Sequence, residues 1–236
     1  RAFAGFSRVY AECSLKPEER RKLLWRKPPQ EEEEWLPAFK VSGEGIYLEL
    51  NEEKLERWEN REDVIRRVKR LKLRYNQART NRGLESRGIT ARFILLHTFA
   101  HLLMNRLTFE CGYSSASLRE RLYVSAHPLC PMAGVLVYTA AGDTEGTMGG
   151  LVRMGKQGYL EPTVQRALEE ARWCSVDPVC MELGTSGGQG PNSCNLAACH
   201  NCALVPETAC EEFNQLLDRA LVIGEPENRD IGYFDF

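Results

Sequence analysis

The residues best suited to chemistry are six cysteines crowded into positions 174–210 of a 236-residue chain. The full sequence holds nine cysteines, an odd number that cannot pair completely in internal disulfides. No basic stretch followed by an apolar core and a small-residue cleavage site is recognisable, so we expect a reducing cytoplasm. In that compartment a cysteine cluster is more often a metal site than a disulfide framework. Positions 174–210 are therefore predicted to bind a metal ion.

The spacing within this stretch favours zinc. Cys199 and Cys202 form a C-x-x-C knuckle, in which two thiolates can approach one ion without strain. Zinc binds four ligands in a tetrahedron, and Cys180 and Cys210 can supply the second pair because the glycine-rich segment 184–191 can close the loop. A site with four thiolates is coordinatively closed, so we expect a structural zinc ion and no catalytic one. A thiol-rich loop without metal is the alternative, and three other side chains could replace a ligand: Cys174, Cys194 and His200.

A second pair of candidate ligands is His97 and His101, which are four residues apart and so face one side of a helix. In zinc proteases a glutamate directly follows the first histidine, but Thr98 stands there in this chain. A packed or hydrogen-bonded histidine pair is therefore favoured over a metal-dependent hydrolase. Because the nucleophile motif G-x-S-x-G and the phosphate-binding glycine motifs are also absent, we predict neither catalytic residues nor an organic cofactor.

The segment 61–92 is strongly basic, with eleven arginines and lysines against three acids, although the chain as a whole carries a net charge of only −2. Such a segment can neutralise phosphates and bind nucleic acid in a salt-dependent manner. A solvated helical face, or a surface that docks on an acidic partner, would have the same composition. The candidate contact residues for nucleic acid or a partner are Arg66, Arg67, Lys69, Arg70, Lys72 and Arg74.

The apolar periodicity predicts an α+β fold in which mixed helices and a small sheet accompany the cysteine cluster near the C-terminus. The longest helix should begin near Thr90 and end at Gly112, and Asn51 should cap a helix through Trp58. Further helices are expected over residues 17–27, 115–123, 161–171 and 210–222, and strands over residues 3–10, 46–50 and 134–139. The apolar runs are too short to span a bilayer, so no membrane contact is expected.

Several of these stretches together resemble a known family. Residues 96–103 and 110–123, the strand 134–139 with the glycine turn 145–151, and the cysteine segments 174–180 and 195–210 occur in the order typical of the MrfA-type zinc-binding, helicase-associated domain family. The cysteine segments are most similar to the DrmB branch of that family, which belongs to the bacterial DISARM anti-phage defence system. The resemblance covers residues 88–222 strongly and residues 2–10 and 37–50 faintly.

The resemblance implies a non-catalytic subunit that assembles with a DrmA-like superfamily 2 helicase on DNA, single-stranded or with a single-stranded end. It carries zinc ligation over to Cys180, Cys199, Cys202 and Cys210, with Cys174 as the alternate ligand. It also implies two regions: residues 1–87, a partly basic remnant of a longer region, and residues 88–236, the zinc-binding domain. A C-terminal part of a fused DNA-repair helicase is the main alternative.

Overall fold

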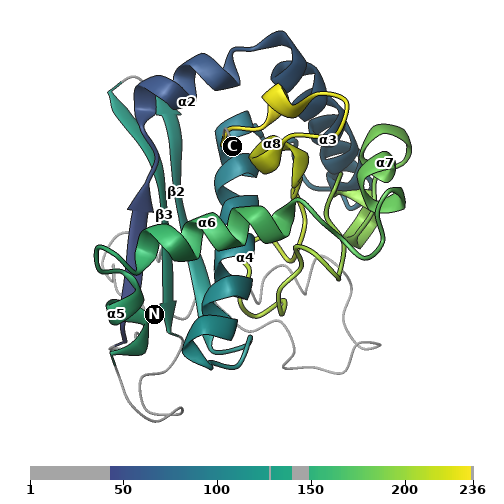
Figure 1. Ribbon diagram of the computed structural model, residues 1–236. Coiled ribbons are helices and arrows are strands. Elements are labelled where there is room, and N and C mark those ends of the chain that lie inside the picture. Colours follow the sequence, from purple (N-terminus) through teal and green to yellow (C-terminus); the bar gives the residue numbers. More distant parts are fainter. Residues whose placement is uncertain (1–42, 128, 140–148, 235–236) are drawn as a thin grey trace, which may run out of the picture. The chain divides into compact units, whose positions relative to one another are not determined.

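The computed structural model describes residues 43–127, 129–139 and 149–234, which all belong to one compact unit, Gly43–Phe236. The strand expected over residues 3–10, the helix over residues 17–27 and most of the glycine turn lie outside these described residues. Residues 43–87 contribute to the same apolar core as the residues after them. The mixed α+β architecture is confirmed (Figure 1).

The sheet has three antiparallel strands in the order β1 (Gly45–Glu49), β3 (Cys130–Thr139) and β2 (Leu118–His127). Its register pairs Ile46 with Val137, and Val137 in turn with Glu120. Side chains alternate between the two faces of a strand, so these three residues share one face. That face packs against a central helix, and it buries Glu120 in a row of otherwise apolar positions.

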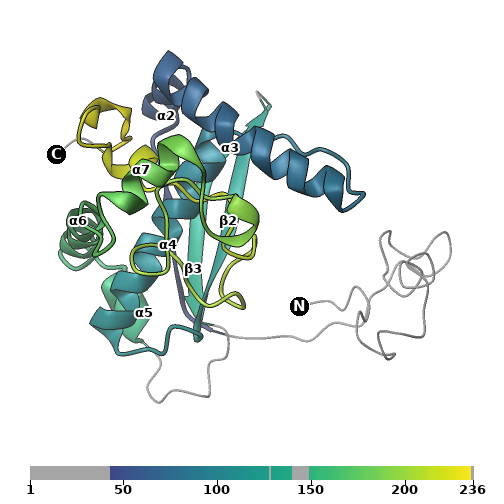
Figure 2. The same cartoon turned by 90° about the vertical axis from the view of Figure 1, so that its right-hand side faces the viewer.

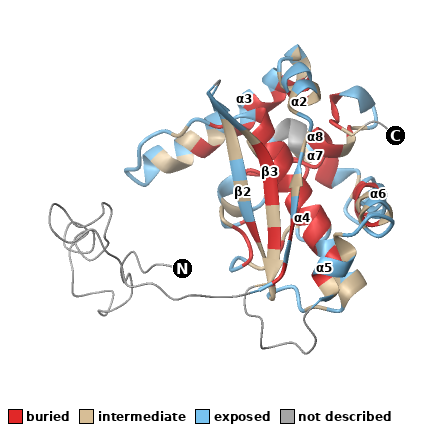
Figure 3. Ribbon diagram, turned by 90° about the vertical axis from the view of Figure 1, so that its left-hand side faces the viewer, coloured by how far each residue is buried: buried red, intermediate tan, exposed pale blue. Residues whose placement is uncertain are grey.

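The central helix is α4 (Ala91–Cys111), and it packs on both β2 and β3 (Figures 1 and 3). Thr90 caps its first turn, because the Thr90 side chain accepts the Phe93 N–H at 3.3 Å. Gly112 ends it in the left-handed conformation, with φ 71°. Two thirds of its residues are buried, including both histidines, so the helix is enclosed on more than one side as its apolar sequence predicts.

The remaining helices lie around α4, and α5 also contacts strand β1. Helix α2 (Glu52–Glu59) begins at Asn51, whose Oδ1 accepts the Lys54 N–H at 2.8 Å, as predicted. Helix α3 (Glu62–Asn81) carries the basic segment, and Figure 2 shows its far end extending beyond the sheet. The others are α5 (Gly150–Met154), α6 (Leu160–Ala171), α7 (Val179–Ser186) and α8 (Ala220–Ile223), with short 3-10 turns at Pro191–Ser193 and Arg229–Ile231.

Two of the predicted helices are wrong. Residues 115–123 contribute to strand β2, because Leu118 to Tyr123 pair along β3. Residues 210–222 form irregular backbone up to α8, because Phe213, Asn214 and Leu216 have positive φ angles that no right-handed helix tolerates. Their backbone groups bond instead to the cysteine-rich segment, as in the Leu216 N–H bond to the Cys194 carbonyl at 2.8 Å.

Candidate metal centre

Four cysteine side chains from three neighbouring segments meet in one cluster. Cys174 follows α6, Cys180 lies in the first turn of α7, and Cys199 and Cys202 form the predicted knuckle. The sulfur–sulfur distances are 3.5 Å from Cys174 to Cys199, 3.8 Å from Cys180 to Cys202 and 3.7 Å across the knuckle. Zinc–sulfur bonds of about 2.3 Å in a tetrahedron put the sulfurs about 3.8 Å apart. The cluster therefore has the size of a four-thiolate zinc site, and its sulfurs are too far apart for disulfides.

Hydrogen-bond donors surround these sulfurs. The backbone N–H of Val176 points at the Cys174 sulfur (3.5 Å), and that of Cys199 points at the Cys202 sulfur (3.3 Å). The Gln189 side-chain amide lies 3.4 Å from the Cys180 sulfur. Donors aimed at sulfur stabilise thiolate over thiol, and thiolate is the form that binds metal.

A buried arginine lies next to the cluster. The Arg219 side chain is fully buried; it donates to the Ala171 carbonyl at 2.8 Å and to both oxygens of Asp177 at 2.8 and 2.9 Å. Its positive charge acts on Cys180 and Cys202. Four thiolates around one zinc ion leave two negative charges, so this arginine offsets part of the charge of a loaded site.

The metal-free cluster divides its protons unevenly. A hydrogen bond from Cys202 lowers the pKa of Cys180 to about 5, and that same bond raises the pKa of Cys202. Burial raises the pKa of Cys199 to about 11. Zinc binds thiolates, so a zinc ion at this cluster would displace the protons of the thiols that hold it.

The structure brings three of the four expected ligands together with the alternate, Cys174, in the fourth place. Cys210 does not reach this cluster. Of the other alternates, Cys194 is buried in the apolar core and its thiol faces the Asn192 carbonyl at 3.4 Å, while His200 is exposed. The residues present fit a zinc ion, with Cys174, Cys180, Cys199 and Cys202 as the four holding side chains.

Cys210 instead joins His97, His101 and Glu120 in a second, fully enclosed cluster. The two imidazole rings meet edge to face, with their centroids 4.5 Å apart, so the histidines do form a packed pair. His97 Nε2 lies 3.1 Å from the Cys210 sulfur and 3.1 Å from Glu120 Oε1. The sequence-based predictions missed Glu120. It occupies every second position together with the apolar residues Leu118, Leu122 and Val124, which is the pattern of the inward face of a strand.

Strong mutual electrostatics accompany this burial. Burial by itself lowers the pKa of His97, but the Glu120 carboxylate more than offsets it and raises the pKa well above the usual range. Burial likewise opposes ionisation of Glu120, yet the two histidines hold its pKa below the usual range. Hydrogen bonding from the histidines outweighs burial and lowers the pKa of Cys210 to about 7. Since none of the four side chains is open to solvent, the cluster offers no position at which a substrate could meet a hydrolytic metal.

The candidate contact residues lie on α3, and they divide between its two faces. Arg66, Lys69, Arg70 and Lys72 are exposed. Arg67 is buried, with its guanidinium 2.5 Å from Asp218 and 2.7 Å from Glu225, so it leaves the set of possible nucleic-acid contacts. Arg74 is half-buried near Gly188. The exposed cationic face is hereafter the four residues Arg66, Lys69, Arg70 and Lys72.

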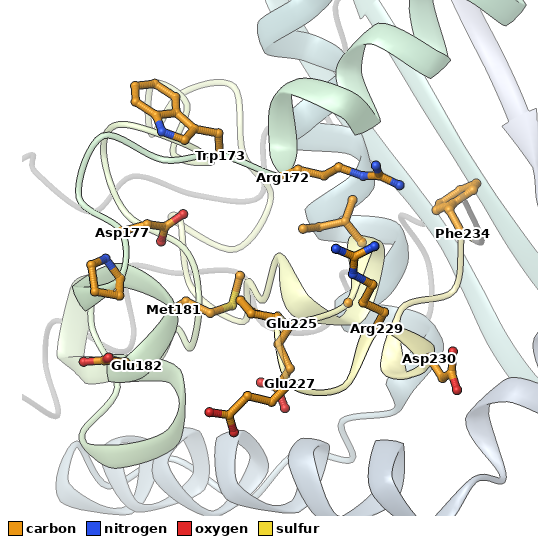
Figure 4. Close-up of a pocket in the computed structure, with 14 residues that line it drawn as sticks. Arg172, Trp173, Asp177, Met181, Glu182, Glu225, Glu227, Arg229, Asp230 and Phe234 are labelled. Atoms are coloured by element: carbon orange, nitrogen blue, oxygen red, sulfur yellow. The ribbon is translucent and has the colours of Figure 1, made fainter.

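A pocket of about 840 Å³ opens beside the cysteine cluster, between the segment 172–182 and the residues after α8. Figure 4 shows the Arg172 guanidinium directed toward Phe234, the Arg229 guanidinium near the centre of the view, and Glu182 and Glu227 on the side away from Phe234. Trp173, which also lines it, is 71% exposed. The described lining residues include no serine, cysteine, histidine or lysine that could act as a nucleophile.

Comparison with known proteins bears on this geometry. Residues 99–203, which contain His101, Glu120 and the four clustered cysteines, match the MrfA Zn-binding domain, and His97 lies just before them. Together with the cluster of four cysteines, this match points to a structural zinc ion. Cys210 lies beyond the matched residues.

The similarity extends beyond the MrfA Zn-binding domain. In an alignment of 223 positions that covers 92% of this chain, the chain is 39% identical to the DISARM protein DrmB of Bacillus paralicheniformis (strain ATCC 9945a / NCIMB 11709 / CD-2). The alignment covers 37% of that protein, so the chain spans little more than a third of the curated relative's length. Within the described part of the chain, no helix is long and apolar enough to cross a bilayer.

Proposed function

We propose that this chain is the zinc-stabilised module of a DrmB-type subunit that acts in bacterial anti-phage defence, in the cytoplasm and without catalysis of its own. The 39% identity to a DISARM protein DrmB across nearly the whole chain is the observation that carries the proposal. In this role the module assembles with a DrmA-like superfamily 2 helicase, which hydrolyses ATP, and helps to hold DNA that is single-stranded or has a single-stranded end.

The exposed cationic face of α3 supports contact with DNA. At 100° per residue its four residues span an arc of the helix opposite to Val64, Val68 and Leu71, which are buried in the core. No acidic residue occurs between Arg66 and Asn81. Leu73, 62% exposed, lies within the same arc, so the face combines cations with apolar surface. Such a surface suits a sugar-phosphate backbone or an acidic protein.

The absence of a catalytic role is supported by the way that the titratable groups are buried. His97 and His101, the pair that a metal-dependent hydrolase would need, have no exposed surface and are already in contact with Glu120 and Cys210. A catalytic zinc keeps one position open for water or substrate, whereas each of the two clusters found among the described residues offers four protein donors.

Assembly is tested by co-expressing the chain with its helicase partner and measuring co-purification, zinc content and DNA affinity of the pair. The pair should co-purify and should bind DNA more tightly than the helicase alone. The proposal would be refuted if a zinc-loaded and folded chain neither co-purified with the helicase nor increased its DNA affinity.

The DNA contact is tested by the salt dependence of binding. Each phosphate contact to single-stranded DNA contributes about 0.7 to the slope of log affinity against log salt concentration. Lys69→Ala and Lys72→Ala should each lower the slope by about that amount. Lys156→Ala is the matched control, because Lys156 is an exposed lysine between α5 and α6 and off the cationic face. Equal slopes for all three variants would assign the face to the protein partner instead.

The match to the MrfA Zn-binding domain also suits the C-terminal part of a fused DNA-repair helicase. The two functions differ in one testable respect. The coding sequence upstream of Arg1 would contain helicase motifs in the fused protein and would lack them in a DrmB-type subunit.

A further inference from the structure

The cluster formed by His97, His101, Glu120 and Cys210 is independent of the cysteine cluster and has no part in the proposed function. The first two residues project from α4, the third from β2, and the fourth from the irregular segment after the knuckle. Their potential ligand atoms all lie within 4.8 Å of one another. All four residues are buried, and both histidines are fully so.

The distances in this cluster are those of a small tetrahedral metal site. His97 Nε2 is 3.1 Å from Cys210 Sγ and 3.1 Å from Glu120 Oε1, and His101 Nε2 is 3.5 Å from the same oxygen. Around four-coordinate zinc, two nitrogen or oxygen donors lie about 3.4 Å apart, and a nitrogen and a sulfur about 3.6 Å apart. These three distances therefore need to change by only tenths of an ångström for the donor atoms to surround one ion.

Two of the potential ligand atoms make no hydrogen bond in the described part of the protein, although His101 Nε2 lies 3.5 Å from Glu120 Oε1. His101 Nε2 and Glu120 Oε2 are buried and make no hydrogen bond. A buried polar atom without a partner costs about 1–3 kcal/mol, and more if it is charged. A metal ion between them accepts an electron pair from each atom and so satisfies both at once.

The surroundings also hold the ligands in metal-binding orientations. His101 Nδ1 lies 2.8 Å from the Ala203 carbonyl oxygen, which can only accept, so the lone pair of the neutral ring is on Nε2. Cys210 Sγ receives the backbone N–H groups of Glu212 at 3.3 Å and Asn214 at 3.2 Å. Glu120 Oε1 receives the Glu211 N–H at 3.0 Å. Outer hydrogen bonds of this kind orient metal-ligating side chains.

We propose that His97, His101, Glu120 and Cys210 bind a second zinc ion. Two neutral imidazoles, one carboxylate and one thiolate balance the charge of a divalent ion, so the loaded site is neutral overall, as an apolar core requires. The mixed nitrogen, oxygen and sulfur donors suit zinc and do not suit magnesium or calcium, which prefer oxygen alone. With four protein ligands the site is closed and structural.

The second zinc ion would join the central helix and the sheet to the segment that follows the first zinc site. Ala203, whose carbonyl orients His101, comes directly after Cys202 of the cysteine cluster, and Cys210 lies eight residues beyond Cys202. The two sites would therefore fix both ends of one short segment.

The test is the zinc stoichiometry of the full chain, measured by mass spectrometry of the metal after zinc loading and removal of excess ion. Wild type should hold two zinc ions, and Cys202→Ser and Glu120→Gln should each hold one. Glu44→Gln is the matched control, because Glu44 is a carboxylate that is only 8% exposed and belongs to neither cluster. The Glu44→Gln variant should therefore hold two zinc ions. One zinc ion in wild type, unchanged in Glu120→Gln, would overturn the proposal.

X-ray absorption at the zinc edge of the wild-type protein gives a second readout that does not depend on the folding of a variant. Two loaded sites would show zinc bound on average to five sulfur and three nitrogen or oxygen atoms among eight ligands. A sulfur-only first shell would overturn the second site while leaving the cysteine site, and the proposed function, intact.

Discussion

At the scale of single residues, Cys174 and Cys210 lie at opposite ends of one cysteine-rich stretch, yet their sulfurs belong to different clusters. Cys174 closes the thiolate tetrahedron because the turn after α6 carries it to within 3.5 Å of Cys199. Cys210 lies against α4 instead, where its sulfur contacts the histidine pair at His97 Nε2. Which of two cysteines joins a knuckle is thus decided by how the flanking elements pack, and spacing along the chain does not determine it.

Replacing Cys174 by serine should release zinc from the cysteine cluster. Because zinc binding in such sites is coupled to folding, we expect the free energy of unfolding of Cys174→Ser to fall by at least about 3 kcal/mol. For a chain of this size that lowers Tm by about 6–12 °C. Zinc analysis and calorimetry would measure both effects. Cys194→Ser is the control, a buried cysteine of the same stretch outside the cluster, and should keep its zinc. A zinc-replete Cys174→Ser protein would show that another residue is the fourth ligand.

Arg67 and Arg66 are neighbours in the basic segment with opposite roles. Arg67→Ala would leave Asp218, which is fully buried, without its cation, a loss that costs about 3–5 kcal/mol. Arg66→Ala removes an exposed side chain and should change stability by no more than about 0.5 kcal/mol. Urea unfolding of the two variants measures the difference. Equal midpoints would contradict the structural role of Arg67.

The residue-level predictions were most accurate where chemistry is encoded locally. The C-x-x-C spacing was enough to identify the knuckle, and Cys180 was found from loop length. The burial of Arg67 depends on a partner 151 residues away, and the inward position of Glu120 depends on pairing with a neighbouring strand. A charge in a sequence does not reveal whether a distant residue neutralises it. Charge counting consequently overestimated the cationic face of α3.

At the scale of elements, both ends of α4 are fixed by local signals, the Thr90 cap and the left-handed Gly112. Strand β2 and the segment 210–222 were misread because their apolar spacing also fits a helix. β3 offers β2 a full antiparallel ladder, and the cysteine-rich segment offers residues 213–217 backbone partners. Those tertiary hydrogen bonds outweigh weak helical preference.

Gly112→Ala should destabilise the protein through backbone strain alone. A Cβ at this position would meet no atom within 4 Å, but the φ of 71° is unfavourable for alanine, at a cost of about 1–2 kcal/mol. Gly88→Ala is the matched control, because its Cβ would also meet open space and its φ is not left-handed. Denaturant unfolding should show a lower midpoint for Gly112→Ala only.

At the scale of the whole molecule, regular structure and cysteine chemistry support different halves of the fold. The sheet and α4 share an apolar core and continuous hydrogen-bonding ladders, whereas the residues between α7 and α8 have little regular structure. That irregular part shares the apolar core but lacks such ladders, and the cysteine cluster joins its segments. We therefore expect its order to depend more on metal than the order of the sheet does.

Chelation should consequently unfold the molecule in part. After zinc removal, backbone amides of residues 174–222 should exchange hydrogen rapidly while those of α4 and β3 remain protected, as measured by hydrogen exchange and mass spectrometry. Acidification should act in the same direction, because it protonates the thiolates that zinc requires. Re-addition of zinc should restore protection, and uniform protection after chelation would contradict the prediction.

The ion pairs beneath α3 have a mechanical consequence. Arg67 fastens the middle of this helix to Asp218 and Glu225, and Arg87 fastens the turn after it to Glu212. All three acids belong to the C-terminal segment that directly follows the cysteine-rich stretch. A pull on the outer side of α3, such as a moving motor protein exerts, would load these pairs in shear and pass the tension to the segment that the metal cross-links.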